Sequence, residues 1–137
     1  MGDKMEQKSK ILLVDDDPDI LEAMSVVLTT HGYTVVTARD GQEGLAKLRS
    51  EKPDLMVLDL MMPRMDGFAV CEELLDPRWA KLSNIPIIIL TSVREDAGRR
   101  RYELGTGLQL RVSDYIEKPV DPGTLLSRVG TYLKKNV

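Results

Sequence analysis

The sequence predicts an α/β fold in which helices cover both faces of a parallel sheet. Short apolar runs alternate five times with segments of helical periodicity, and the loops between them are short. The runs at 11–14 and 55–58 are apolar at every position, as in strands that are buried on both faces. Right-handed crossovers join parallel strands of this kind, so we expect one doubly wound sheet.

The five predicted strands can be placed one by one. They correspond to the apolar or β-branched runs at residues 11–14, 33–38, 55–58, 85–90 and 115–117. The third run ends at Asp59, which Pro63 and Gly67 follow, so the chain must turn before a helix starts. The fourth run ends in Thr91, and the fifth is followed by Lys118.

The helices are predicted from caps and periodicity. Asp17 before a proline and Asp40 after the second strand are expected N-caps, and Gly32 is expected to end the first helix. His31 is interpreted as a helix-end residue rather than a metal ligand, because there is no second histidine. The only tryptophan, Trp79, is placed in a loop. The later helices are expected at 68–75, at 94–104 and from about 121 to 135.

Size, charge and cysteine content narrow the class of protein. A chain of 137 residues is the size of one domain, and we expect a domain at 10–137 after a flexible polar segment at 1–9. The net charge of −3 gives no electrostatic reason to expect direct nucleic-acid binding. Cys71 is the only cysteine, which favours a reducing compartment. No apolar run suggests a membrane span or signal peptide, so we expect a cytoplasmic protein without membrane insertion.

The residues that follow the strands suggest a chemical site. In a parallel sheet, Asp15 and Asp16, Asp59, Thr91 and Lys118 all come to the same edge. Three close carboxylates repel one another, and a hard divalent cation such as Mg²⁺ resolves that conflict. A carboxylate beside a metal, a lysine and a hydroxyl is suited to accept a phosphoryl group. For Asp59 considered alone, capping of the following helix is the alternative.

Four segments together resemble the receiver domain of two-component response regulators, the CheY-like family. They are Leu-Val-Asp-Asp-Asp at 13–17, Asp-Leu-Met-Met-Pro-Arg-Met-Asp-Gly at 59–67, Leu-Thr-Ser at 90–92 and Lys-Pro at 118–119. They occur in the family's order and extend over nearly the whole chain. The resemblance implies a flavodoxin-like sheet of strand order 2-1-3-4-5.

The resemblance also assigns roles to the acidic residues. Asp59 matches the phosphoacceptor and a metal ligand. Asp16 matches the direct Mg²⁺ ligand, and Asp15 matches the neighbour that acts largely through metal-bound water. Met61 would contribute its backbone carbonyl to the metal. Asp17 has no assigned role beyond the N-cap.

The remaining matched residues belong to a switch. Thr91 matches the hydroxyl residue that moves to the phosphoryl oxygens, Lys118 matches the cation that pairs with them, and the bond from Lys118 to Pro119 matches one that is cis in the family. Tyr115 matches the aromatic residue that changes rotamer when Thr91 moves. Phosphorylation would thus alter the surface of the last two strand–helix units.

The resemblance implies partners as well as a reaction. The donor would be a sensor histidine kinase or a phosphotransfer protein, and the output a downstream protein target or a separate effector. A phosphorylation-dependent homodimer is left open. The segment 105–113 is longer than usual for the family, so partner choice at that face is undecided. Because the last predicted helix reaches the C-terminus, we expect a stand-alone regulator, with a receiver excised from a larger protein such as a hybrid kinase as the alternative.

Other functions are considered against the same residues. A phosphorylation-independent binding module, or pseudo-receiver, would lack a key residue, and none is missing. A flavin protein would want a Gly- and Ser/Thr-rich loop where Asp15, Asp16 and Asp17 stand. A phosphohydrolase would need a second acid/base carboxylate and a cap domain. We therefore expect no enzymatic activity other than Mg²⁺-dependent self-phosphorylation from a phosphodonor and slow self-dephosphorylation. The dephosphorylation should be slow because the side chains of Met61 and Val93 cannot orient an attacking water.

Overall fold

The computed structural model describes residues 8–92 and 112–133, and it has the predicted parallel sheet. The strand order is β2-β1-β3-β4-β5, and every neighbouring pair is parallel. The prediction of a doubly wound sheet of order 2-1-3-4-5 is therefore confirmed. The strands are β1 (Lys10–Val14), β2 (Thr34–Ala38), β3 (Leu55–Asp59), β4 (Ile87–Thr91) and β5 (Asp114–Glu117). The described helices are α1 (Pro18–Thr30), α2 (Gly41–Glu51), α3 (Gly67–Glu73), the 3₁₀ helix η1 (Pro77–Trp79) and α5 (Pro122–Tyr132).

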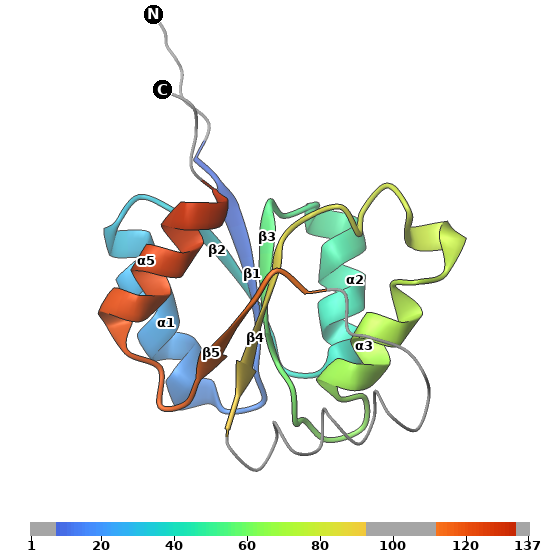
Figure 1. The fold of residues 1–137 in the computed structure, drawn as a ribbon, viewed down its shortest axis with the longest axis horizontal. Coiled ribbons are helices and arrows are strands. Elements are labelled where there is room, and N and C mark those ends of the chain that lie inside the picture. The colour runs from blue at the N-terminus through green and yellow to red at the C-terminus, as the bar shows by residue number, and fades with distance from the viewer. Residues whose placement is uncertain (1–7, 93–111, 134–137) are drawn as a thin grey trace, which may run out of the picture.

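The sheet lies between two helical layers. Helices α1 and α5 cover one face, and α2 and α3 cover the other (Figure 1). Successive residues of a buried strand face opposite layers, so β1 contributes Ile11 and Leu13 to one core and Leu12 and Val14 to the other. The central strands therefore have to be apolar at every position, which is the pattern seen in the sequence.

The predicted helix caps are present. The Asp17 carboxylate accepts a hydrogen bond from the Asp19 amide, and the Asp40 carboxylate accepts one from the Glu43 amide. His31 is the C-cap of α1, and its imidazole lies 2.9 Å from the Val27 carbonyl oxygen, as expected of a helix-end residue. The two aspartate caps fix where α1 and α2 begin, at the edge of the sheet where β1 and β2 end.

Helix α3 is shorter than predicted. It ends at Glu73, so Leu74 is only its C-cap and Leu75 lies outside it. Pro77 disfavours helical backbone in the residue before it, and Asp76 instead caps η1. Trp79, predicted in a loop, belongs to η1 and donates a hydrogen bond from its indole nitrogen to Glu73.

Other boundaries also differ. Strand β4 begins at Ile87 rather than at residue 85, because Pro86 has no amide to donate to the sheet. Helix α5 ends at Tyr132, and residues 134 and 135 lie outside the described part of the chain. The predicted helix at 94–104 and most of the segment 105–113 also lie outside it. Of that segment, Val112 and Ser113 are described, and Val112 packs against the core beneath α2 and α3.

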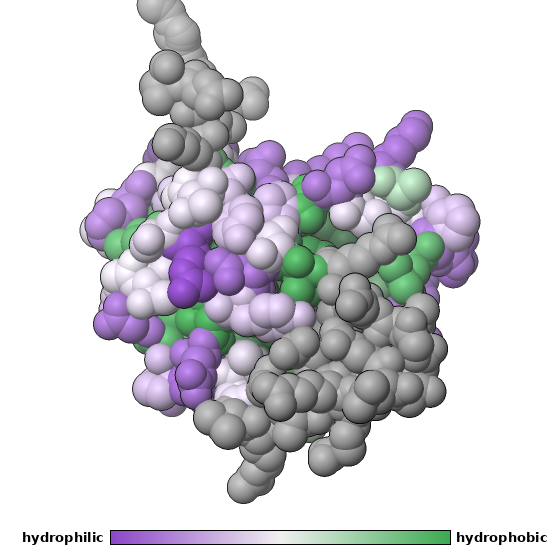
Figure 2. Space-filling model, in the orientation of Figure 1, coloured by the Kyte–Doolittle hydropathy of each residue, from purple (hydrophilic) through white to green (hydrophobic). Residues whose placement is uncertain are grey.

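The surface of the described residues is mostly polar. On the face shown in Figure 2, hydrophobic residues form small separate areas among hydrophilic ones. Val26, Met61 and Leu75 are the large apolar residues that the described part of the chain exposes. None of its helices has the length and apolar character needed to cross a membrane.

Candidate functional site

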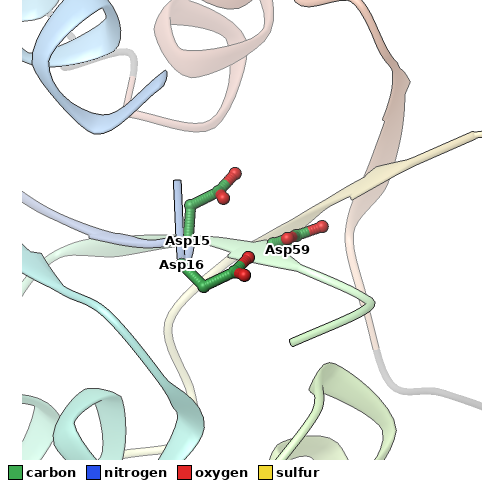
Figure 3. Close-up of side chains that lie close together, drawn as sticks. All are labelled: Asp15, Asp16 and Asp59. Carbon is green, nitrogen blue, oxygen red and sulfur yellow. The ribbon is translucent and has the colours of Figure 1, made fainter. Parts of the chain in front are cut away.

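The carboxyl ends of β1 and β3 bring three aspartates together. Asp59 is the last residue of β3, and Asp15 and Asp16 directly follow β1. Because β1 and β3 are neighbours in register, these residues meet although they are far apart in the chain (Figure 3). Each offers a carboxylate oxygen within 4.8 Å of the others. The juxtaposition predicted from the strand ends is therefore present.

Burial distinguishes the three carboxylates. Asp15 is 0% exposed and Asp59 is 1% exposed, whereas Asp16 is exposed. Asp15 accepts a hydrogen bond from the Asp17 amide with Oδ1. Its Oδ2 is buried and has no hydrogen-bond partner among the described residues. Burial is the main cause that raises the pKa of the Asp15 carboxyl, against the Asp17 amide and the positive charge of Lys118.

Lys118 reaches the cluster from the end of β5. Its ammonium donates a hydrogen bond of 2.9 Å to Asp59 Oδ1 and lies 3.7 Å from Asp15 Oδ2. Its main-chain amide donates to the Thr91 carbonyl at the end of β4, and the peptide bond to Pro119 is cis, as the resemblance implied. The site therefore combines three carboxylates with one ammonium among the residues that the structure describes.

The predicted switch residues lie on β4, which is the neighbour of β3, and on β5, the next strand outward. Thr91 is the last residue of β4, is buried, and donates its hydroxyl proton to the Ser92 carbonyl. Tyr115 is in β5 and packs partly buried against the core beneath α2 and α3. Its main-chain carbonyl accepts a hydrogen bond from Arg128 of α5, which also pairs with Asp114. These contacts connect β5 to α5.

Close packing around the loop between β3 and α3 was not predicted from the sequence. Met61 lies in this loop with its side chain half exposed. An added Cβ at Gly67 would lie 2.7 Å from the Asp59 carbonyl oxygen, and one at Gly41 would collide with the Met65 carbonyl oxygen. Both glycines follow an aspartate that caps a helix, which is the only sequence signal for this close packing. Nothing in the sequence signalled that Arg64 adopts a left-handed backbone.

The residues present fit a hard divalent cation. Carboxylate and carbonyl oxygens are the ligands that such ions take, and one or two carboxylates usually hold Mg²⁺ together with water. A cation would relieve the repulsion of the three aspartates, and it or a water that it binds could satisfy Asp15 Oδ2. Since Asp16 is exposed, an ion has access from solvent.

The fold and this edge of the sheet define a class of protein. The sequence model of the response regulator receiver domain matches residues 11–130. The chain belongs to this family. Its residues carry a CheY-like arrangement of a parallel five-stranded sheet with an acidic cluster at the carboxyl ends of β1 and β3.

Particular relatives narrow the comparison. The chain is 42% identical over 129 residues to the "probable transcriptional regulator ycf27" of Porphyridium aerugineum, covering 94% of this chain and 50% of that protein. It is 41% identical over 127 residues to PhoP of Bacillus subtilis, the alkaline phosphatase synthesis transcriptional regulatory protein, covering 93% of this chain and 49% of that one. The chain thus spans about half the length of these curated relatives.

Solved structures show the same fold over nearly the whole chain. The chemotaxis response regulator CheY4 of Vibrio cholerae has a TM-score of 0.77 and 30% identity, covering 93% of this chain and 100% of that one. The receiver domain of a signal transduction histidine kinase from Syntrophus aciditrophicus has a TM-score of 0.77 and 31% identity, covering 94% of both chains. Similar receivers therefore occur in different protein contexts.

Proposed function

We propose that this receiver domain accepts a phosphoryl group on Asp59 in a Mg²⁺-dependent reaction. The observation that carries the proposal is the buried Asp59 carboxylate, held 2.9 Å from Lys118 beside two further aspartates. A carboxylate oxygen is a nucleophile that can attack phosphorus. Asp16, Asp59 and the Met61 carbonyl would hold the ion, with Asp15 acting through a bound water. When bound, Mg²⁺ would neutralise charge on the transferring phosphoryl group.

The chemical step is a transfer between two residues. A carboxylate oxygen of Asp59 forms a bond to phosphorus while the phosphorus–nitrogen bond of a phosphohistidine donor breaks. The imidazole leaves with the electron pair of that bond and keeps the proton on its other nitrogen. Lys118 moves from pairing with the carboxylate to pairing with a phosphoryl oxygen, and the Thr91 hydroxyl, which now donates to the Ser92 carbonyl, donates to another.

The output follows from the new contacts. Bonds from Thr91 and Lys118 form only in the phosphorylated state, so they favour a different arrangement of the chain that follows β4 and β5. Tyr115 would change rotamer as Thr91 moves. The surface that would switch comprises the predicted helix at 94–104 together with β5 and α5.

The proposed partners follow from this reaction. A sensor histidine kinase or phosphotransfer protein supplies the phosphoryl group, and a downstream protein or separate effector reads the switched surface. The named relatives are transcriptional regulators about twice as long. For this chain, with a net charge of −3, we propose neither direct contact with nucleic acid nor insertion into a membrane, and we place its action in the cytoplasm. We propose no enzymatic turnover beyond its own phosphorylation and slow dephosphorylation.

Intact-mass measurement tests the proposal directly. With acetyl phosphate and MgCl2, the wild type should gain the mass of one phosphoryl group, and Asp59→Asn should not. Beryllofluoride with Mg²⁺ should shift the amide resonances around Thr91 and Tyr115 in the wild type only. A wild type that shows no Mg²⁺-dependent response would instead support a pseudo-receiver that binds its partners without phosphorylation.

The lifetime of the phosphorylated form is a second expected outcome. The exposed Met61 side chain is apolar and cannot orient a water toward Asp59, and Val93, which lies outside the described residues, is apolar too. We therefore expect slow loss of the phosphoryl group when the donor is removed. Substituting Met61→Asn, which offers an amide to water, should shorten the lifetime measured by intact mass. Loss of the group from the wild type within seconds would contradict this reasoning.

A further inference from the structure

The β3–α3 loop, residues 60–66, is fastened to the neighbouring helix α2 as well as to its own ends. At its base, the Gly67 amide donates to the Leu60 carbonyl at 2.9 Å. At its tip, the Met65 carbonyl accepts a hydrogen bond of 3.1 Å from the Gly41 amide. The loop that follows Asp59 is therefore held from two sides.

Arg64 adds a charged contact at the tip of this loop. Its guanidinium donates from Nη2 to Asp40 Oδ2 at 2.7 Å. Its backbone has a φ of 67°, in the left-handed region that residues other than glycine rarely adopt. A residue in that region persists where its surroundings hold it, and the contact with Asp40 is such a restraint.

Asp40 is a well-fixed anchor for that contact. While Oδ2 accepts from Arg64, Oδ1 accepts from the Glu43 amide at 2.8 Å and so caps α2. The Asp40 side chain is 13% exposed, whereas that of Arg64 is 68% exposed. The pKa of the Asp40 carboxyl is lowered first by the Glu43 amide and then by Arg64, consistent with a carboxylate that is held by donors on both oxygens.

The sheet order places this contact near the acidic cluster. Strand β1 lies between β2 and β3, and its end leads into Asp15 and Asp16. Asp40 follows β2 and Arg64 follows β3, so their ion pair joins the two loops that flank the end of β1. The loop thus restrained is the one that carries the Met61 carbonyl.

We propose that Arg64 is a positioning residue for the metal site, acting through Asp40 to hold the β3–α3 loop where the Met61 carbonyl meets the cation. This inference rests on the proposed function, since it concerns the same Mg²⁺ site. Arg64 does not itself touch the cation. It restricts the loop before the ion arrives, so that less order has to be gained on binding.

The role of Arg64 is tested by titrating the metal-free protein with MgCl2 and monitoring the amide resonances by NMR. Arg64→Gln removes the ion pair without placing a glycine at this left-handed position. Mg²⁺ should therefore bind roughly two- to fivefold more weakly. Arg64→Lys, which can still reach Asp40 with a charge, should restore most of the affinity. Loss of a positive charge near the site would by itself tighten Mg²⁺ binding, so the two explanations predict opposite signs.

The chain offers a matched control. Arg78 is 71% exposed and pairs with Glu73 and Asp76 beyond the other end of α3. Arg78→Gln makes the same chemical change and should leave Mg²⁺ affinity as in the wild type. In an Asp40→Asn background, which keeps the Oδ1 cap acceptor, Arg64→Gln should have no further effect.

The outcomes separate this inference from the proposed function. Absence of Mg²⁺ binding in the wild type would refute both. Wild-type binding with equal or tighter binding by Arg64→Gln would overturn the inference alone, as would equal weakening in Arg64→Gln and Arg78→Gln. A readout without metal completes the test: with EDTA, the Gly41 amide should exchange with solvent faster in Arg64→Gln than in the wild type, and unchanged exchange would also overturn the inference.

Discussion

Replacing Asp15 by asparagine should make the metal-free protein more stable although it removes a residue of the proposed site. Asp15 is 0% exposed and its Oδ2 has no hydrogen-bond partner among the described residues. Asparagine has nearly the same shape and keeps Oδ1 as the acceptor for the Asp17 amide. The substitution therefore removes the negative charge with little change in packing.

The magnitude follows from the distances in the site. The carboxylate oxygens of the cluster lie within 4.8 Å of one another, and two unit charges at that upper limit repel by roughly 3.5 kcal/mol at an effective dielectric constant of about 20. Lys118, at 3.7 Å, attracts Asp15 by roughly 4.5 kcal/mol on the same scale. The repulsion from Asp59, with a screened contribution from the exposed Asp16, nearly cancels this attraction. What remains is the desolvation of a buried carboxylate oxygen, about 1–2 kcal/mol, which Asp15→Asn should recover as stability.

Urea unfolding, followed by the fluorescence of the buried Trp79, provides the assay. In EDTA, Asp15→Asn should raise the free energy of unfolding, whereas excess MgCl2 should stabilise the wild type more than the variant. Asp19→Asn makes the same charge change in the first turn of α1, where a carboxylate is favourable, and should be neutral or slightly destabilising. An Asp15→Asn variant that is less stable than the wild type in EDTA would refute the reasoning, because Lys118 would then outweigh the desolvation.

Three further predictions concern the packing and titration of single residues. Gly67→Ala places a methyl group 2.7 Å from the Asp59 carbonyl oxygen and should lower the free energy of unfolding by about 1–3 kcal/mol. Gly130→Ala meets nothing within 4 Å and should stabilise α5 by about 0.5–1 kcal/mol. Urea unfolding that ranked the two variants in the reverse order would contradict this packing. Hydrogen-bond donors lower the folded pKa of Asp40, so its contribution to stability is present above its ordinary pKa of 3.8 and is lost as pH falls through the lower folded value. The free energy of unfolding should therefore fall less steeply with acid in Asp40→Asn than in the wild type. An unchanged pH profile would contradict that shift. Burial raises the pKa of the Cys71 thiol to about 12, so iodoacetamide should label it at neutral pH only after unfolding, and rapid labelling of the native protein would show that the thiol is accessible.

The predictable part of the fold was its local pattern. Apolar runs identified the central strands β1, β3 and β4, because strands buried between two helical layers cannot alternate with polar residues. The edge strands β2 and β5 are only partly buried and contain polar residues, and β-branched residues indicated them instead. The N-caps Asp17 and Asp40 were predictable because a capping carboxylate acts within three residues of itself. The end of α3 was not, because Leu74 and Leu75 continue the apolar pattern of a helix beyond the residue at which the chain turns toward Pro77.

The candidate site shows the same division. Asp15, Asp59 and Lys118 could be grouped from the sequence, since parallel strands present their carboxyl ends at one edge. The unequal burial of Asp15 and Asp16 could not be predicted, because neighbouring residues face different surroundings once the strand has ended.

The sequence by itself determined the fold class, the strand order through the family resemblance, and the set of side chains at the edge of the sheet. Only the tertiary structure decided that Asp15 Oδ2 is left without a hydrogen-bond partner in the described part of the chain, and that Arg64 reaches Asp40. The physical reason is the range of the interactions. Periodicity and capping act over a few residues and can be recognised along the chain. The contact between the loops that follow β2 and β3 depends instead on how helices α2 and α3 pack on the same face of the sheet.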